Sequence, residues 1–354
     1  AKTKKGMKPR LRILSISLLF KGLILSGASK ATGPVENFEA LWNMFNERYA
    51  FFELRGVDWK AQYEKYRPKV TKNTTDEELY GLMCEMLKPL KDGHVNLKAK
   101  SLGKKNPYNP EETPRFLKEF NNRKLEKQFE QLVSKTLRDN NFGELKDSTD
   151  LLLFSRNKSL GYLLITEFEG VRAKKLDEAL DKVLALMDGT KGLIIDIRLN
   201  PGGTDQCVYQ IASRFADKKR VGHHRKTKTG ADGFSELKTR YLNPHGDTYL
   251  KPIILLTHDA SFSGADVFAM VMAELPQVTL VGEPTNGIFS NMLEKKLPNG
   301  WKYTLSFQVY YSADMTCYEG KGIPVDIPMK NMRSDLEKGE DPLVVKALEL
   351  LSDK

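Results

Sequence analysis

The segment "GLIIDIRLNPGG", residues 192–203, carries the clearest sign of how this chain folds. Its first half is an almost continuous apolar run, which is typical of a strand buried on both faces of a helix-covered sheet. The run ends in Asn-Pro-Gly-Gly, and the "TDQCVYQIASRFA" that follows has a helical pattern. A buried strand, a tight turn and a helix in this order predict an α/β domain.

The same alternation continues on both sides of this segment. We expect strands in "LGYLLITEF" (160–168), "PIILLT" (252–257), "VTLVG" (278–282) and "WKYTLSFQVYYS" (301–312), and helices in "VRAKKLDEALDKVLALMDG" (171–189) and "SGADVFAMVMAEL" (263–275). This succession predicts that the α/β domain covers residues 156–333. The amphipathic "DPLVVKALELL" predicts a C-terminal helix within residues 334–354.

Residues 33–98 have a helical pattern instead. Thr75 and Glu78 form a capping box, and the helix that they begin should end near Gly93, because glycine tolerates the left-handed conformation that closes helices. His94 is therefore expected on a turn. Residues 99–155 are polar and charged, and we interpret them as an insertion or cap made of exposed helix and loop.

The chain begins with a basic leader, residues 1–32. Its first 30 residues contain eight Lys or Arg and no acid, so they account for +8 of the formal net charge of +10. The remaining charge is small and shows no basic stripe with interleaved aromatics, which argues against nucleic acid binding. The 354-residue chain, 40% apolar and 29% charged, has the composition of a globular protein.

The leader resembles an export signal. A basic stretch precedes the apolar "ILSISLLF", and small residues Ser26 and Ala28 stand at a cleavage-like spacing. An amphipathic N-terminal segment is the alternative. Ala28 occupies the place of the lipidated cysteine of a lipoprotein box, so no lipid anchor is expected. The apolar pieces are too short to span a membrane.

The sequence contains no motif that predicts a metal site. The three cysteines, Cys84, Cys207 and Cys317, form no CxxC motif or Cys/His cluster. Neither a zinc site nor a disulfide framework is therefore expected.

"SFSGAD", residues 261–266, separates a predicted strand from a predicted helix. One of its serines could be a nucleophile, or the segment could be an ordinary helix cap made by Ser261 or Ser263. The segment does not match the GxSxG elbow, because Ser261 occupies the first glycine position. A serine nucleophile needs a base, and His94 and His258 are the two candidates. His223, His224 and His245 lie in polar stretches typical of surface loops.

Gly202 and Gly203 allow the backbone to approach a ligand closely, and their N–H groups could face a developing negative charge. The alternative is an ordinary tight turn. The segment is not a nucleotide-binding loop, since the third glycine of that motif is missing.

Four motifs in this order resemble one family of serine peptidases. They are "DGHVNL", "GLIIDIRLNPGG", "DASFSGADVFAMVM" with "TLVGEPTNG", and "YEGKGIPVDI". The chain is similar to the family that includes the carboxyl-terminal processing proteases, the tricorn core protease and the retinoid-binding protein repeats. The resemblance implies a Clp/crotonase-like α/β catalytic core behind a helical N-terminal domain. The chain departs from the processing proteases in one respect: residues 99–150 do not show the pattern of a PDZ module, so recognition of a free C-terminus is not expected from the resemblance.

The family's functional residues map onto particular positions. Ser263 matches the nucleophile, and Gly202, Gly203 and Gly264 match the oxyanion hole. The lysine of the processing proteases is replaced by Ile288, so a Ser-Lys dyad is not supported.

The tricorn branch pairs its serine with a histidine and a glutamate, which match His94 and Glu319. That branch has a serine before the histidine, where this chain has Gly93. Either Glu319 reaches His94 directly, or another hydroxyl such as that of Ser290 lies between them.

The function implied by the resemblance is a serine endopeptidase that cuts peptides or unfolded proteins through an acyl-enzyme. It needs no cofactor, and with the leader it implies an exported protein of the bacterial periplasm or cell envelope, without stable membrane insertion after the signal is removed. The alternative is a ligand-binding protein on the same fold, with little or no peptidase activity. A crotonase-type acyl-CoA enzyme is disfavoured, since no CoA-phosphate site is evident.

Overall fold

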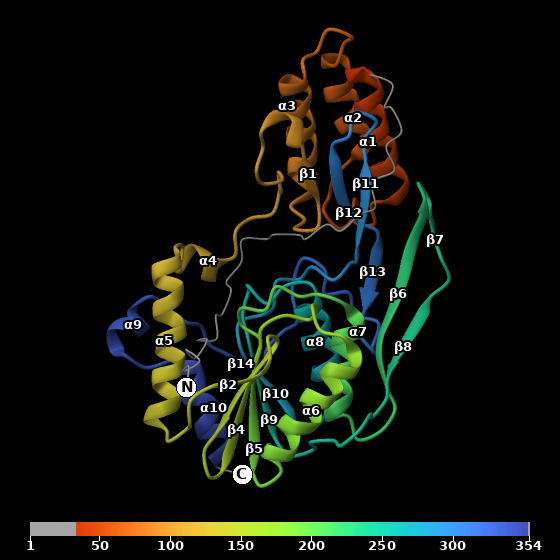
Figure 1. The fold of residues 1–354 in the computed structure, drawn as a ribbon. Helices are drawn as coiled ribbons and strands as arrows, with labels where there is room; N and C mark the ends of the chain where they lie inside the picture. Colours follow the sequence, from red (N-terminus) through yellow and green to blue (C-terminus); the bar gives the residue numbers. More distant parts are fainter. Residues whose placement is uncertain (1–32, 353–354) are drawn as a thin grey trace, which may run out of the picture.

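The computed structural model describes residues 33–352. The predicted export signal within residues 1–32 lies outside the described residues. In Figure 1 the red and orange N-terminal helices stand above a larger α/β body. Within residues 33–352, no helix combines the length and the apolar character that crossing a bilayer requires.

The N-terminal part is helical, as expected, but it is completed by a distant segment. Its elements are α1 (Pro34–Arg48), α2 (Trp59–Tyr66), α3 (Asp76–Leu87), β1 (Asn96–Lys98) and the short 3-10 turns Arg67–Lys69, Lys88–Leu90 and Lys100–Leu102. The predicted capping box of Thr75 and Glu78 begins α3. Strand β1 pairs with β12 (Lys302–Ser306), which pairs with β11 (Met292–Lys296). The rings of Phe45 and Tyr303 lie 6.1 Å apart in the shared core.

The expected single strand 301–312 is therefore wrong. It breaks at Phe307 into β12, which belongs to the N-terminal part, and β13 (Gln308–Tyr311), which pairs with β6 (Arg220–Gly230). The uniform alternation of apolar and aromatic residues conceals this break. As a result, the N-terminal part and the body share one continuous segment of chain.

The body is built on a sheet with the order β14-β10-β9-β5-β4-β3-β2 in the described part of the chain. Its strands are β2 (Lys146–Thr149), β3 (Leu152–Arg156), β4 (Leu160–Ile165), β5 (Gly192–Asp196), β9 (Ile253–Thr257), β10 (Val278–Gly282) and β14 (Ile327–Pro328). In this sheet β4, β5, β9, β10 and β14 run parallel to one another. Strand β3 runs antiparallel to both of its neighbours, β4 and β2. The predicted α/β architecture is confirmed, although its sheet begins before residue 156.

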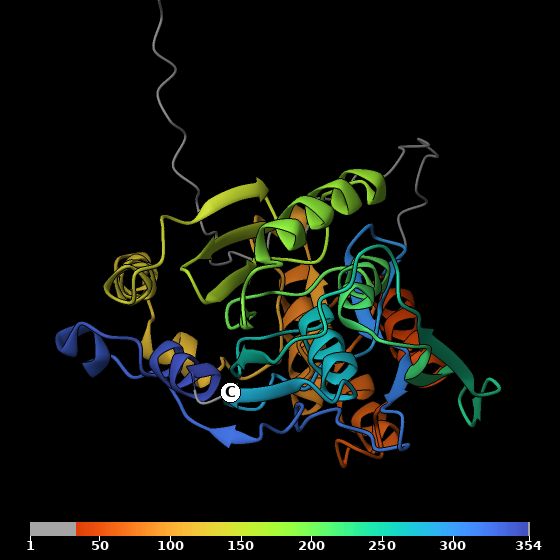
Figure 2. The same cartoon turned by 90° about the horizontal axis from the view of Figure 1, so that it is seen from below.

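Helices cover both faces of this sheet, which explains why its central strands are apolar throughout (Figures 1 and 2). One face is covered by α6 (Ala173–Met187), α7 (Asp205–Ala212, with a 3-10 turn at Ser213–Phe215) and α8 (Gly264–Ala273). The other face is covered by α4 (Arg115–Glu119), α5 (Arg123–Asp139) and α10 (Pro342–Ser352), with α9 (Ser334–Lys338) beside them.

The interpretation of residues 99–155 as exposed helix and loop is thus wrong. Helix α5 buries one face of apolar side chains, among them Phe129 and Leu132, against the sheet. The charged residues on the outer face of α5 make the whole segment look exposed when only its composition is considered. This segment also supplies β2 and β3 to the sheet.

The polar stretch around His223 is a strand and not a surface loop. Strand β6 pairs with β7 (Gly233–Phe234) and β8 (Lys238–Leu242) in a long hairpin. His223 is fully buried, and its Nδ1 lies 2.8 Å from the hydroxyl of Tyr209. The surface expectation for His223 is wrong, because Tyr209 and the body screen one face of an otherwise polar strand.

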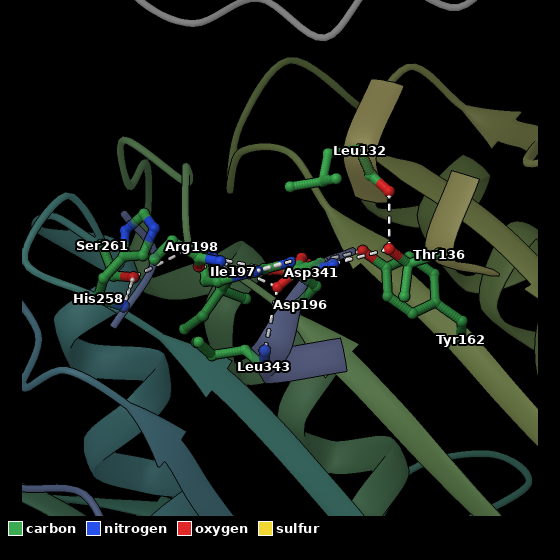
Figure 3. Close-up of polar contacts among 11 residues, drawn as sticks. Leu132, Thr136, Tyr162, Asp196, Ile197, Arg198, His258, Ser261, Asp341 and Leu343 are labelled. Atoms are coloured by element: carbon green, nitrogen blue, oxygen red, sulfur yellow. Dashed lines mark hydrogen bonds and ion pairs between the residues drawn. The ribbon is translucent and has the colours of Figure 1, made fainter. Parts of the chain in front are cut away.

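A buried ion network lies just beyond β5 (Figure 3). The Arg198 side chain is 1% exposed and donates to Asp196 at 2.6 Å and to Asp341 at 2.8 Å. Tyr162 donates to Asp196 at 2.6 Å. Leaving such a charge unpaired would cost about 3 to 5 kcal/mol. The network therefore fixes the end of β5, and with it the turn before Gly202, to the start of α10.

Candidate active site

Ser263 begins α8 in a conformation that few residues other than glycine adopt. Its φ is 57° and its ψ is −110°. Such a backbone conformation costs of order 1 to 3 kcal/mol and persists only where surrounding contacts hold it. Ser261 supplies one contact: its buried hydroxyl donates to the Ile197 carbonyl at 2.9 Å and accepts from the N–H of His258. Of the two serines, Ser261 supports the turn and Ser263 is partly exposed.

Asp266 supplies the strongest of these contacts, and sequence analysis missed it. Its buried carboxylate accepts N–H bonds from Ser263 at 2.7 Å, from Gly287 at 2.7 Å and from Ile288 at 3.2 Å. Burial raises the pKa of Asp266 to about 7, against the lowering effect of these donors and of Thr285. The signal was present in the sequence, because Ser-Gly-Ala-Asp has the spacing of a capping box.

His94 lies beside Ser263. Its Nε2 is 3.0 Å from Ser263 Oγ, and its ring meets Phe262 edge-on with 5.3 Å between centroids. The turn after α3 is fixed by Asp92, whose Oδ1 accepts the His94 N–H at 2.8 Å. The other candidate base, His258, is buried against Phe116 with 4.0 Å between ring centroids, and no described contact joins it to Ser263.

The environment keeps His94 neutral. Burial lowers the pKa of His94 to about 4, while the charge of Asp92 and the backbone of Ser290 act in the opposite direction. A neutral imidazole is the form that can accept a proton from a serine hydroxyl. The pair is therefore in the protonation state that nucleophilic attack requires.

Glu319 lies in the same buried region but does not hydrogen-bond to His94. Its Oε1 accepts from Arg55 at 3.2 Å and its Oε2 accepts from the Phe289 N–H at 2.9 Å. Burial raises the pKa of Glu319, with the charge of Asp92 adding to the effect. Direct contact with His94, one of the two alternatives, is thus not seen in the structure.

The Ser290 hydroxyl does not bridge Glu319 and His94 either. It donates to the Asn291 carbonyl at 2.7 Å and accepts from the N–H groups of Phe307 and Gln308. What approaches His94 is the backbone of Ser290. The presence of glycine and not serine at position 93 also has a steric explanation, since a Cβ there would lie 2.8 Å from the ring of Phe262.

The glycine turn meets the start of α8. Gly202 and Gly203 have φ values of +96° and +138°, and a Cβ on Gly264 would lie 2.9 Å from the Gly203 nitrogen. The Gly202 N–H is occupied, because it donates to Asn200 Oδ1 at 2.8 Å. No hydrogen bond within residues 33–352 is found for the N–H groups of Gly203 and Gly264. Of the three glycine N–H groups, those of Gly203 and Gly264 are thus without a partner among the described residues, while that of Gly202 is occupied.

The site does not contain the side chains of a metal centre. Across residues 33–352, no three His, Cys, Asp or Glu side chains come together in a way that could hold a metal ion.

Two family models match the described part of the chain. The model of "Peptidase family S41" matches residues 159–329, and the model of the "Tricorn protease C1 domain" matches residues 34–88. Residues 159–329 therefore form a peptidase family S41 domain. The two matches correspond to the body that carries Ser263 and to the helical part that leads to His94.

Individual members of family S41 show how far the similarity extends. The carboxy-terminal processing protease CtpA of Bacillus subtilis is 28% identical over 169 residues, which are 48% of this chain and 34% of the relative. The chain thus matches about a third of that relative's length. A candidate peptidase from Parabacteroides merdae has a crystal structure with a TM-score of 0.73 and 29% identity, covering 90% of this chain and 97% of that one. The tricorn protease shares the fold, with a TM-score of 0.55 and 14% identity over 90% of this chain and 36% of its own.

Replacing Asp266 should destabilise the site. Asp266→Ala leaves three buried N–H donors without an acceptor, so we expect the free energy of unfolding to fall by about 3 kcal/mol, as measured by urea denaturation. Asp266→Asn keeps the shape and one acceptor oxygen, and should lose less. Asp232→Ala, on an exposed turn, should change stability by no more than about 0.5 kcal/mol. A wild-type midpoint for Asp266→Ala would show that the carboxylate does not support the turn.

Proposed function

We propose that this chain is a serine peptidase that hydrolyses peptides or unfolded proteins, with Ser263 as nucleophile and His94 as general base. The observation that carries the proposal is the 3.0 Å separation of Ser263 Oγ and His94 Nε2 in a chain with a peptidase family S41 domain. Assignment of the body to the Clp/crotonase-like folds is part of this proposal. Its support is the parallel sheet with the Gly202-Gly203 turn facing the start of α8.

The proposed reaction uses only groups of this chain and water. His94 Nε2 takes the proton of Ser263 Oγ as the oxygen attacks the scissile carbonyl carbon. The negative charge that forms on the carbonyl oxygen is received by the N–H groups of Gly203 and Gly264. His94 then gives its proton to the leaving amine, which leaves an acyl ester on Ser263. Water, deprotonated by His94, attacks this ester, and His94 returns the proton to Ser263 Oγ as the acyl group leaves, which restores both residues.

The carboxylates behind His94 support it in two ways. The buried charge of Asp92 favours the imidazolium that forms during attack. Glu319 is proposed to act on the His94 ring indirectly. It accepts hydrogen bonds from Arg55 and from the Phe289 N–H, and so fixes the neighbouring Ser290 backbone against His94. In this proposal Glu319 positions the histidine through the backbone.

A ligand-binding protein on the same fold would be the better interpretation if Ser263 and His94 were far apart. Their hydrogen-bonding distance supports the enzyme. The strained backbone of Ser263 is also more easily understood for a nucleophile than for a passive cleft residue.

Loss of either member of the pair should abolish turnover. Ser263→Ala and His94→Ala are each expected to lower kcat/KM for a fluorogenic peptide by about 10⁴-fold or more. Ser263→Ala should also abolish labelling by a fluorophosphonate probe. Ser235→Ala and His224→Ala, on the β6–β8 hairpin, are matched controls that should keep both activities. Cleavage at the wild-type rate by either active-site variant would refute the proposal.

Activity should persist at unusually low pH. Because the pKa of His94 is lowered to about 4, the base stays neutral above that pH and becomes protonated below it. We therefore expect kcat/KM to rise with pH through about 4 and to be level by pH 6, and not to rise through the usual histidine value near 6.5. Enzyme returned to pH 7 after each incubation controls for acid unfolding. A half-maximum near 6.5 would contradict the described environment of His94.

We also propose that the protein is exported to the periplasm or cell envelope of a bacterium. The support is the basic and apolar order of residues 8–28, with Ser26 and Ala28 at a cleavage-like spacing. Expression of the full chain in a bacterium, followed by fractionation and N-terminal sequencing, should give an envelope or periplasmic chain that begins just after Ala28. An intact leader in the cytosolic fraction would exclude this location.

A further inference from the structure

The positive charge of the body is concentrated on one hairpin. Residues 217–240, which cover β6, β7 and most of β8, contain eight Lys or Arg and three Asp or Glu, an excess of +5. The whole chain beyond the first 30 residues carries only +2, so the remaining body is net negative. In Figure 1 this hairpin extends along the side of the body toward the N-terminal helices. A local excess of this kind attracts groups of the opposite charge.

Two arginines of the hairpin share a single carboxylate. Arg225 Nη1 and Arg240 Nη1 lie 3.8 Å and 3.6 Å from the same oxygen of Asp205. That oxygen already accepts a hydrogen bond from the Tyr310 hydroxyl at 2.9 Å. Both arginine distances exceed normal hydrogen-bond length, and the two side chains are 32% and 35% exposed. One positive charge and several N–H donors thus remain available to a ligand.

The surrounding aromatic groups hold the arginines in place without neutralising them. The Arg240 guanidinium lies over the Tyr209 ring at 3.9 Å, and Arg225 Nη1 is 3.4 Å from the Tyr310 hydroxyl. Burial lowers the pKa of His223 to about 3, with Arg240 and Arg225 adding to the effect. The histidine behind the pair is therefore neutral, and the positive charge comes from the arginines alone. Arginines fixed in this way lose little freedom when they bind a planar anion.

This pair lies next to both sides of the active site. Asp205 follows Gly203 by two residues, so their Cα atoms are at most about 7 Å apart. On the other side, Tyr310 accepts a hydrogen bond from Asn291 at 3.1 Å, and Asn291 directly follows Ser290, whose backbone approaches His94. A peptide held across Ser263 in an extended conformation would reach the arginines within a few residues.

We propose that Arg225 and Arg240 form a subsite that binds a carboxylate of the substrate peptide, a few residues from the bond that is cut. The carboxylate belongs to an Asp or Glu side chain or to the peptide's own C-terminus. Guanidinium groups bind carboxylates through paired, charge-assisted hydrogen bonds, which fits the free donors of this pair. This inference rests on the proposed peptidase function, and it adds a preference for acidic peptides.

The test is binding to the Ser263→Ala variant, which requires no turnover. Fluorescein-labelled peptides of one sequence would carry Gln or Glu at each position in turn, with either a free or an amidated C-terminus, and Kd would be measured by anisotropy. We expect a carboxylate at the favoured position to lower Kd by about 10-fold or more. The gain should shrink with added salt. If only the free C-terminus matters, the subsite takes the terminal carboxylate, and if an internal Glu matters, it takes a side chain.

Three substitutions in the same background show whether the arginines are responsible. Arg225→Gln and Arg240→Gln should each weaken acidic peptides by about 10-fold and leave neutral peptides unchanged. Asp205→Asn keeps the acceptor for Tyr310 but removes the competing charge, so it should bind acidic peptides more tightly. Such a gain cannot arise from misfolding. Arg220→Gln is the matched control, because Arg220 lies on β6 like Arg225 but forms an ion pair with Asp217 at 2.9 Å.

The outcomes separate this inference from the proposed function. Equal Kd values for acidic and neutral peptides, or an acidic preference that survives both arginine substitutions, would overturn the subsite even if Ser263-dependent cleavage is found. An arginine-dependent preference with no cleavage by the wild-type chain would support the subsite and refute the peptidase.

Discussion

The active site depends on the contact between the Asp266 carboxylate and the backbone of Ser263. A serine at φ 57° is strained, and three N–H bonds to one buried carboxylate offset that strain. The same carboxylate holds Gly287 and Ile288, which lead to the Ser290 backbone beside His94. One side chain thus fixes both the backbone of Ser263 and the segment that leads to His94. The Arg198 network fixes the end of β5, which leads into the Gly202-Gly203 turn.

The histidine is prepared for its role by desolvation. Its surroundings contain two buried acidic side chains, Asp92 and Glu319, and the nearby Arg55. Burial disfavours the charged imidazole in the resting state, while the charge of Asp92 favours it once it forms. In the proposed mechanism, these opposing effects keep the His94 ring neutral before attack and stabilise its charged form afterwards.

The sequence predicted those features that follow from local pattern. The almost continuous apolar run of 192–199 was enough to place the sheet, and the capping box at Thr75 was enough to place the start of α3. The order of four motifs was enough to select Ser263 and His94. What it could not predict depends on distant partners. Nothing near Phe307 shows that one apolar run will divide between two sheets, and nothing near His223 reveals the Tyr209 hydroxyl that satisfies it. The occupied N–H of Gly202 likewise depends on the side chain of Asn200.

Strand β12 completes the N-terminal part that carries His94, so the site can form only after this late segment of the chain has been synthesised. His94 lies next to β1, whose only described strand partner is β12, and the Thr304 hydroxyl of β12 donates to the His94 carbonyl at 2.7 Å. These partners are separated by about two hundred residues of sequence. A chain still emerging from the ribosome would have its serine and its histidine well before it has the strand that seats the histidine. Under the proposed peptidase function, this order of synthesis would keep Ser263 and His94 from acting together until β12 has joined the fold.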